Sequence, residues 1–141
     1  MERNASAVWT GTLKEGKGSI TAPSGAFRDV PYTFATRFEN APGTNPEELI
    51  AAAHAACYSM ALSGKLVAAG LAPSRIETTA TVTLEKKEAG QTVTRSHLKT
   101  TASVPGATKD AFAKAAEDAK ATCPISRLLN TEITLDATLQ G

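Results

Sequence analysis

The sequence predicts an α+β fold in which mostly antiparallel sheets surround one long buried central helix. Residues 76–85 alternate between two faces, and residues 92–104 form a second such run after a turn at Ala89-Gly90. One long helix is predicted over residues 46–69. The strands follow one another as hairpins rather than as repeated β-α-β crossovers, which favours antiparallel pairing.

The predicted element order is β-β-β-α-β-β-α-α-β. Strands are expected over residues 7–13, 17–22, 32–38, 76–85, 92–104 and 133–139, and helices over 46–69, 108–121 and 123–130. Within the second helix, the apolar stripe is Phe112, Ala115, Ala116 and Ala119. No repeat or long linker divides the chain, so we expect a single domain over residues 1–141.

The central helix has the clearest boundaries. Asn45 is a good N-cap, Pro46 suits the first helical position, and Glu48 is placed to complete a capping box. Gly70 suits the left-handed residue after the helix. Nearly every residue from 49 to 62 is small or apolar on all faces, so we expect this helix to be buried all round.

Composition excludes several classes of partner. The net charge is +1 without a basic block, which argues against nucleic acid. The apolar run from Leu49 to Leu62 is too short to span a bilayer, and the first residues form no apolar signal region. We therefore expect a cytoplasmic protein, in which a permanent structural disulfide would be unusual.

The two cysteines are the main candidates for chemistry. A nucleophilic thiol and a second thiol that captures it are the minimum for thiol redox catalysis, although core packing is the plain alternative for either. Cys123 precedes Pro124 at a helix start, where backbone N–H groups favour a thiolate. Cys57 lies within the long helix and needs a nearby cation. Arg37 is a candidate, since a guanidinium stays charged when partly desolvated.

Other polar residues near the cysteines leave alternatives open. His54 packs along the long helix three residues before Cys57, where its ring could also tune the thiol. A zinc site would have to combine these two residues with Cys123 and His97, without any close-spaced ligand pair. Glu47, unlike its neighbour that caps the helix, is left free for function.

The sequence resembles the OsmC branch of the OsmC/Ohr family, the osmotically inducible and organic-hydroperoxide-resistance proteins, over almost the whole chain. The motifs that carry the resemblance are Thr36-Arg37-Phe38-Glu39, Gly43-Thr44-Asn45-Pro46-Glu47-Glu48-Leu49-Ile50, Ala52-Ala53-His54-Ala55-Ala56-Cys57 and Cys123-Pro124-Ile125-Ser126. The resemblance implies a thiol peroxidase that prefers organic hydroperoxides to hydrogen peroxide. It also implies an intertwined homodimer with active sites at the subunit interface, and neither a cofactor nor a metal.

The resemblance also assigns roles to four residues. Cys57 matches the peroxidatic cysteine and Cys123 the resolving cysteine, which implies a Cys57–Cys123 disulfide in the catalytic cycle. Arg37 matches the arginine that activates the thiolate, and Glu47 the glutamate that orients this arginine. An external dithiol, of the lipoyl type in this family, would regenerate the two thiols.

One geometric consequence follows from the helix. Ten residues separate Glu47 from Cys57, which is about 15 Å along a helix axis, so one chain cannot bring them together. We therefore expect each site to mix residues of two subunits, or Arg37 to bridge from a partner. The competing hypotheses are a non-enzymatic binding module of the same fold and a Cys/His zinc-binding protein.

Overall fold

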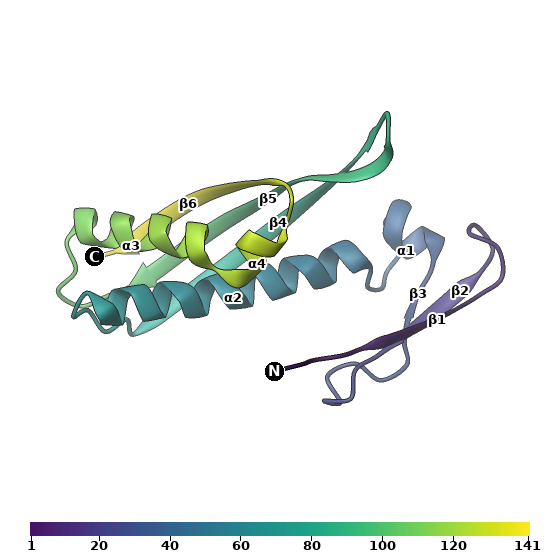
Figure 1. Cartoon of the computed structure of the whole chain (residues 1–141), viewed down its shortest axis with the longest axis horizontal. Helices are drawn as coiled ribbons and strands as arrows, with labels where there is room; N and C mark the ends of the chain where they lie inside the picture. Colours follow the sequence, from purple (N-terminus) through teal and green to yellow (C-terminus); the bar gives the residue numbers. More distant parts are fainter. The chain divides into compact units, whose positions relative to one another are not determined.

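The chain forms two compact units that meet within one helix. A computed structural model describes all of residues 1–141 (Figure 1). One unit comprises Met1–Leu49 and the other Ile50–Gly141. The prediction of a single domain stays a prediction.

The unit Met1–Leu49 contains a small antiparallel sheet. Its strands are β1 (Ser6–Thr10), β2 (Lys17–Thr21) and β3 (Val30–Tyr32), paired in the order β1-β2-β3. The rings of Trp9 and Tyr32 pack 5.4 Å apart on this sheet. The first two strands lie close to their predicted positions.

The third predicted strand, over residues 32–38, is wrong in its second half. Strand β3 ends at Tyr32, and helix α1 (Phe34–Phe38) follows. Thr33 caps this helix, because its hydroxyl accepts the Thr36 N–H at 3.2 Å while the Thr36 hydroxyl accepts the Thr33 N–H at 2.9 Å. This reciprocal capping box outweighs the strand propensity of the apolar side chains. Arg37 therefore lies in the last turn of a helix rather than on a strand.

The unit Ile50–Gly141 contains the second sheet. Strands β4 (Arg75–Lys87) and β5 (Gly90–Ser103) form a long antiparallel hairpin, as predicted. Strand β6 (Glu132–Gln140) pairs with β5 in parallel, so the expectation of hairpin connections alone is wrong at this strand. The chain reaches β6 through α3 (Lys109–Thr122) and α4 (Pro124–Leu128), which together make the crossover that a parallel pair requires. Three of the four strand pairings are antiparallel, so the predicted α+β class is confirmed.

The core of this unit lies between its helices and one face of the sheet. Helix α2 (Pro46–Ala68) begins and ends almost where predicted. From Ile50 onward it shares a buried cluster with α3 and β5, and the ribbons of α2 and α3 run along the sheet in Figure 1. The four predicted stripe residues of α3 are all buried. The buried cluster comprises Tyr58, Leu62, Leu66, Leu98, Ala102, Val104, Phe112, Ala115, Ala116, Ala119 and Cys123.

The prediction that α2 is buried all round is wrong for a single chain. Tyr58, Leu62 and Leu66 are wholly buried, but Met60 is 77% exposed and Val67 60% exposed. The exposed face, defined as Ala53, Ala56, Met60, Gly64 and Val67, has no partner within the chain. The small and apolar residues of α2 therefore occupy both its buried side and its exposed side.

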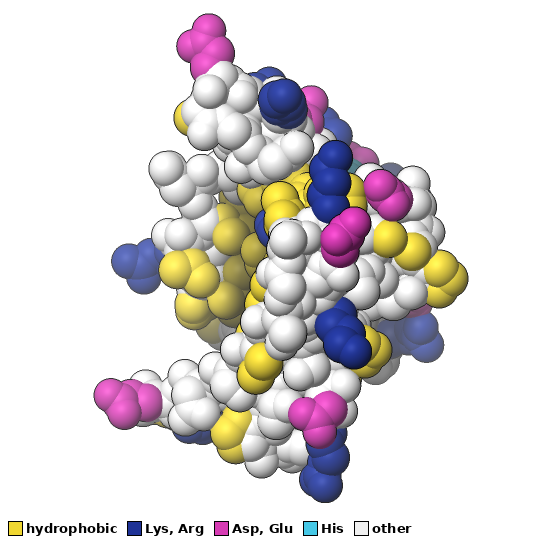
Figure 2. Space-filling model, turned by 90° about the vertical axis from the view of Figure 1, so that its right-hand side faces the viewer, with side chains coloured by type: hydrophobic (Ala, Val, Ile, Leu, Met, Phe, Trp, Pro, Cys, Tyr) yellow, Lys and Arg dark blue, Asp and Glu magenta, His cyan; other side chains and the backbone are white.

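The surface charges are mixed. Figure 2 shows one face of the molecule, on which Lys and Arg side chains are interspersed with Asp and Glu side chains. This distribution agrees with the net charge of +1 and differs from the one-sided basic surface of nucleic-acid-binding proteins. None of the helices is both long and apolar enough to cross a lipid bilayer.

Candidate active site

The two cysteines meet within the unit Ile50–Gly141. Cys57 comes from the middle of α2, and Cys123 from the junction of α3 and α4. The Cys123 thiol donates a hydrogen bond to the Cys57 sulfur, with 3.0 Å between the two Sγ atoms. Cys123 is wholly buried and Cys57 is partly exposed. The thiols are therefore close enough to react with each other, and Cys57 is the one that solvent reaches.

A sharp change of chain direction places Cys123. Its backbone N–H donates to Ala119 O at 2.9 Å and closes α3, and its carbonyl accepts the Arg127 N–H at 3.0 Å and opens α4. Pro124 occupies the first position of α4, where its missing N–H costs nothing. One residue thus ends a helix and begins the next, which fixes its backbone beside α2.

The surroundings of Cys57 within this unit disfavour a thiolate. Burial raises the pKa of the Cys57 thiol, and the hydrogen bond from Cys123 raises this pKa further. A hydrogen bond from the backbone of Ile125 acts in the opposite direction and lowers the pKa of Cys57. The sequence predicts that N–H groups at the start of α4 stabilise a Cys123 thiolate, but the N–H of Ile125 acts on Cys57 instead. A reactive Cys57 needs an additional positive charge.

His54 forms a buried polar link one helical turn before Cys57. Its ring is wholly buried, with Nδ1 2.7 Å from Ser96 Oγ and Nε2 2.7 Å from Ser126 Oγ. Burial lowers the pKa of His54, so the neutral ring donates to one serine and accepts from the other. Sequence reasoning missed both serines, which lie 42 and 72 residues away along the chain. Only Ser126 belongs to a motif that the sequence singles out, Cys123-Pro124-Ile125-Ser126.

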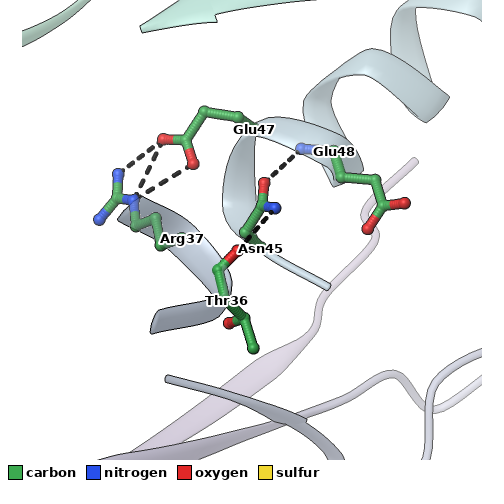
Figure 3. Close-up of polar contacts among 5 residues, drawn as sticks. All are labelled: Thr36, Arg37, Asn45, Glu47 and Glu48. Carbon is green, nitrogen blue, oxygen red and sulfur yellow. Dashed lines mark hydrogen bonds and ion pairs between the residues drawn. The ribbon is translucent and has the colours of Figure 1, made fainter. Parts of the chain in front are cut away.

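Arg37 and Glu47 form an ion pair within the unit Met1–Leu49, drawn in Figure 3. The Arg37 Nη2 donates to Glu47 Oε1 at 2.7 Å, and Nε lies 3.2 Å from both carboxylate oxygens. The Arg37 side chain is 37% exposed and that of Glu47 13% exposed. The guanidinium also lies 5.1 Å from the centre of the Phe38 ring. Several contacts hold the arginine in one orientation, and part of it remains open to solvent.

Asn45 connects the two helices that carry this ion pair. Its side-chain oxygen accepts the Glu48 N–H at 2.9 Å and caps α2, while its amide nitrogen donates to Thr36 O of α1 at 3.2 Å (Figure 3). The Glu48 carboxylate accepts a hydrogen bond from the Thr44 hydroxyl at 2.8 Å, rather than from Asn45 as a capping box would require. The predicted N-cap is present, and Glu47 is free to bind Arg37.

The comparison with known proteins identifies the family. Residues 38–138 match the sequence model of the OsmC-like proteins. The chain belongs to the OsmC family. It is 49% identical to Peroxiredoxin OsmC of Escherichia coli (strain K12) over 141 residues, which cover 100% of this chain and 99% of that protein. Peroxiredoxin OsmC of Shigella flexneri matches to the same extent.

Solved structures share the OsmC-like fold at low sequence identity. The organic hydroperoxide resistance protein OhrB of Bacillus subtilis superimposes with a TM-score of 0.68 at 22% identity, covering 97% of this chain and 98% of that one. An OsmC-like protein from Mycoplasma pneumoniae gives a TM-score of 0.77 at 14% identity, and the match covers 100% of this chain and 99% of that one. The predicted family resemblance and fold class are thereby confirmed.

In this OsmC-family chain the four predicted site residues form two pairs, one in each unit. One pair consists of two thiols within reach of each other, and the other consists of a guanidinium held in place by a carboxylate. The zinc hypothesis finds no corresponding arrangement, because no three His, Cys, Asp or Glu side chains are grouped as metal ligands. His54 bonds to two serines, and His97 lies on the other side of β5 with Thr134 and Asp136.

Proposed function

We propose that this OsmC-family chain is a cysteine-based peroxidase that reduces organic hydroperoxides, and hydrogen peroxide less well, through Cys57. The observation that carries the proposal is the 3.0 Å separation of the Cys57 and Cys123 sulfurs in a site where Cys57 is partly exposed. Identity of 49% over the full length to a protein named Peroxiredoxin OsmC supports the same activity. No cofactor is needed for this chemistry.

The reaction proceeds in three steps. The Cys57 thiolate attacks one peroxide oxygen; the O–O bond breaks, and with one proton the products are a Cys57 sulfenic acid and an alcohol. Cys123 then attacks the Cys57 sulfur, a disulfide forms and water leaves. A dithiol reductant, for which we propose a lipoyl-type compound, reduces this disulfide by exchange and restores both thiols. We place the cycle in the cytoplasm, where glutathione and thioredoxin keep thiols reduced.

The positive charge comes from Arg37. Burial raises the pKa of Cys57, and a guanidinium close to the sulfur would stabilise the thiolate and polarise the peroxide. Glu47 orients the guanidinium through the ion pair. Because Glu47 and Cys57 lie ten residues apart on one helix, about 15 Å along its axis, we propose that the ion pair acts on the Cys57 of a partner subunit.

The homodimer uses the exposed face of α2. This face is apolar, and its small residues, Ala53, Ala56 and Gly64, allow close approach by another helix. A second copy of the chain is the occupant that satisfies both this face and the two-subunit site. Met60 and Val67 would then be buried at the interface.

A peroxide-consumption assay tests the function. The purified chain, supplied with dihydrolipoamide, should consume cumene hydroperoxide faster than hydrogen peroxide. Without dihydrolipoamide, the hydroperoxide should cause the loss of two free thiols per chain. Cys57→Ser should abolish consumption, and Cys123→Ser should permit one turnover and then stop. Full consumption by Cys57→Ser would overturn the proposal. Stoichiometric zinc that disappears in Cys57→Ser would instead favour the binding hypothesis.

A further inference from the structure

Two links join α2 to α4, and they are spaced alike on both helices. Cys57 contacts Cys123 at 3.0 Å, and His54 contacts Ser126 at 2.7 Å. His54 lies three residues before Cys57, and Ser126 three residues after Cys123. Residues three apart share a helix face, so the two links lie side by side, one helical turn apart. One link carries the proposed chemistry and the other does not.

Helix α4 has few other attachments. It is five residues long, none of its residues is fully buried, and no side chain caps its N-terminus. Ile125 packs partly against the core, and its backbone also donates to Cys57. Cys123 is held on one side by the end of α3 and on the other by α4, and α4 is bonded to α2 through His54 and through the backbone of Ile125.

The His54 ring is itself well anchored. It is wholly buried, and its second nitrogen bonds to Ser96, which is wholly buried on β5. A hydrophobic residue at this position would fill space, but a ring with both nitrogens bonded fixes direction and distance. The link thus connects α4 to both α2 and the sheet, one helical turn from the reacting sulfurs.

We propose that His54 is a positioning residue that, through Ser126, holds α4 so that Cys123 captures the Cys57 sulfenic acid before a second peroxide does. The inference rests on the proposed function. Capture by Cys123 gives the disulfide and water, whereas a second hydroperoxide oxidises the sulfenic acid to a sulfinic acid and leaves as an alcohol. Which product forms depends on how closely Cys123 is held beside Cys57.

The test measures this partition. Reduced protein receives a series of cumene hydroperoxide concentrations without reductant, and intact-protein mass spectrometry quantifies disulfide and sulfinic acid. In Ser126→Ala the ratio of sulfinic acid to disulfide at each concentration should rise about tenfold, the effect of losing one hydrogen bond to a buried partner. The ratio does not depend on the rate of the first oxidation. Ser126→Thr keeps the hydroxyl and should restore the ratio.

Further variants separate positioning from general destabilisation. Ser96→Ala removes the hydrogen bond to Nδ1 of His54. It should raise the ratio of sulfinic acid to disulfide, but by less than Ser126→Ala. Ser103 lies at the end of β5, and its hydroxyl donates to the Gln140 side chain of β6. Ser103→Ala removes this hydroxyl and should leave the ratio unchanged. A wild-type ratio in folded Ser126→Ala, or no rescue by Ser126→Thr, would overturn the inference. Wild-type protein that forms neither product would instead overturn the proposed function.

Discussion

The ion pair and the thiol pair have opposite physical surroundings. Arg37 and Glu47 are charged, partly exposed and joined by three nitrogen–oxygen contacts of 2.7–3.2 Å. Cys57 and Cys123 lie among apolar residues, beside a neutral histidine whose polar atoms are all paired. One region holds charge in contact with water, and the other holds one thiol wholly buried and the second only partly exposed.

From this difference we expect that neither region alone is sufficient for peroxide reduction. The environment of Cys57 within its own unit raises its pKa, which lowers the thiolate fraction at neutral pH. The ion pair has the charge to reverse this shift but contains no nucleophile. We therefore expect a site that is completed only when two chains associate.

The largest expected effect comes from removing the charge. Arg37→Met should lower kcat/KM for cumene hydroperoxide by about a thousandfold, because the thiolate and the developing negative charge lose their main stabilisation. The raised pKa of Cys57 then governs the reaction, so activity of the variant should continue to rise with pH above neutrality, where we expect the activity of the wild-type protein to be constant. Stopped-flow oxidation measured across pH provides both quantities.

Arg28→Met is the matched control, since Arg28 is an exposed arginine of the same unit. It should keep the wild-type rate and pH profile. A pH profile of Arg37→Met that coincides with that of the wild type would show that Arg37 does not act on the thiol.

The exposed face of α2 gives the next effect. Met60→Glu places a charge on a surface that we propose to be covered by a second chain, and burial of an unpaired charge should raise the dimer dissociation constant by about a hundredfold. Sedimentation velocity measures the association, and activity should fall with the dimer fraction. Leu13→Glu, on the loop after β1, changes another exposed apolar residue and should leave association intact. A fully active monomer would refute the two-subunit site.

A smaller effect is expected when the arginine keeps its charge but loses its orientation. Glu47→Gln removes the carboxylate that accepts from Arg37 and should reduce kcat/KM about tenfold, the value of one charge-assisted hydrogen bond. Steady-state kinetics with saturating reductant measure this change. Glu48→Gln alters the neighbouring carboxylate, which bonds only Thr44, and should retain activity. Equal losses in both variants would contradict the role of Glu47.

How much the sequence predicts depends on whether the signal is local. The ends of α2 were predictable because Asn45, Pro46 and Gly70 act within one turn of the helix. The stripe of α3 was predictable from its period. The cysteine pairing came from motifs rather than from spacing, because Cys57 and Cys123 lie 66 residues apart.

Other features depend on partners that no periodicity reveals. The direction of β6 follows from the crossover through α3 and α4, while alternation along a strand is the same in either direction. The bonds from His54 to Ser96 and Ser126 span three elements. Helix α1 is a local exception, since the aromatic residues Phe34 and Phe38 favour a strand and two threonine hydroxyls decide the outcome.

The smallest expected effect comes from removing one of the two threonine hydroxyls that cap α1. Thr33→Ala removes the hydroxyl that caps α1 and should cost about 1 kcal/mol of local helix stability, with a decrease in activity of about threefold because Arg37 is in the last turn. Amide hydrogen exchange over residues 34–38 measures the local loss. Thr33→Ser keeps the hydroxyl and should protect these amides as the wild type does. If both variants exchange alike, the aromatic packing of Phe34 on Phe38, at 4.8 Å, rather than the cap holds the helix that presents the arginine.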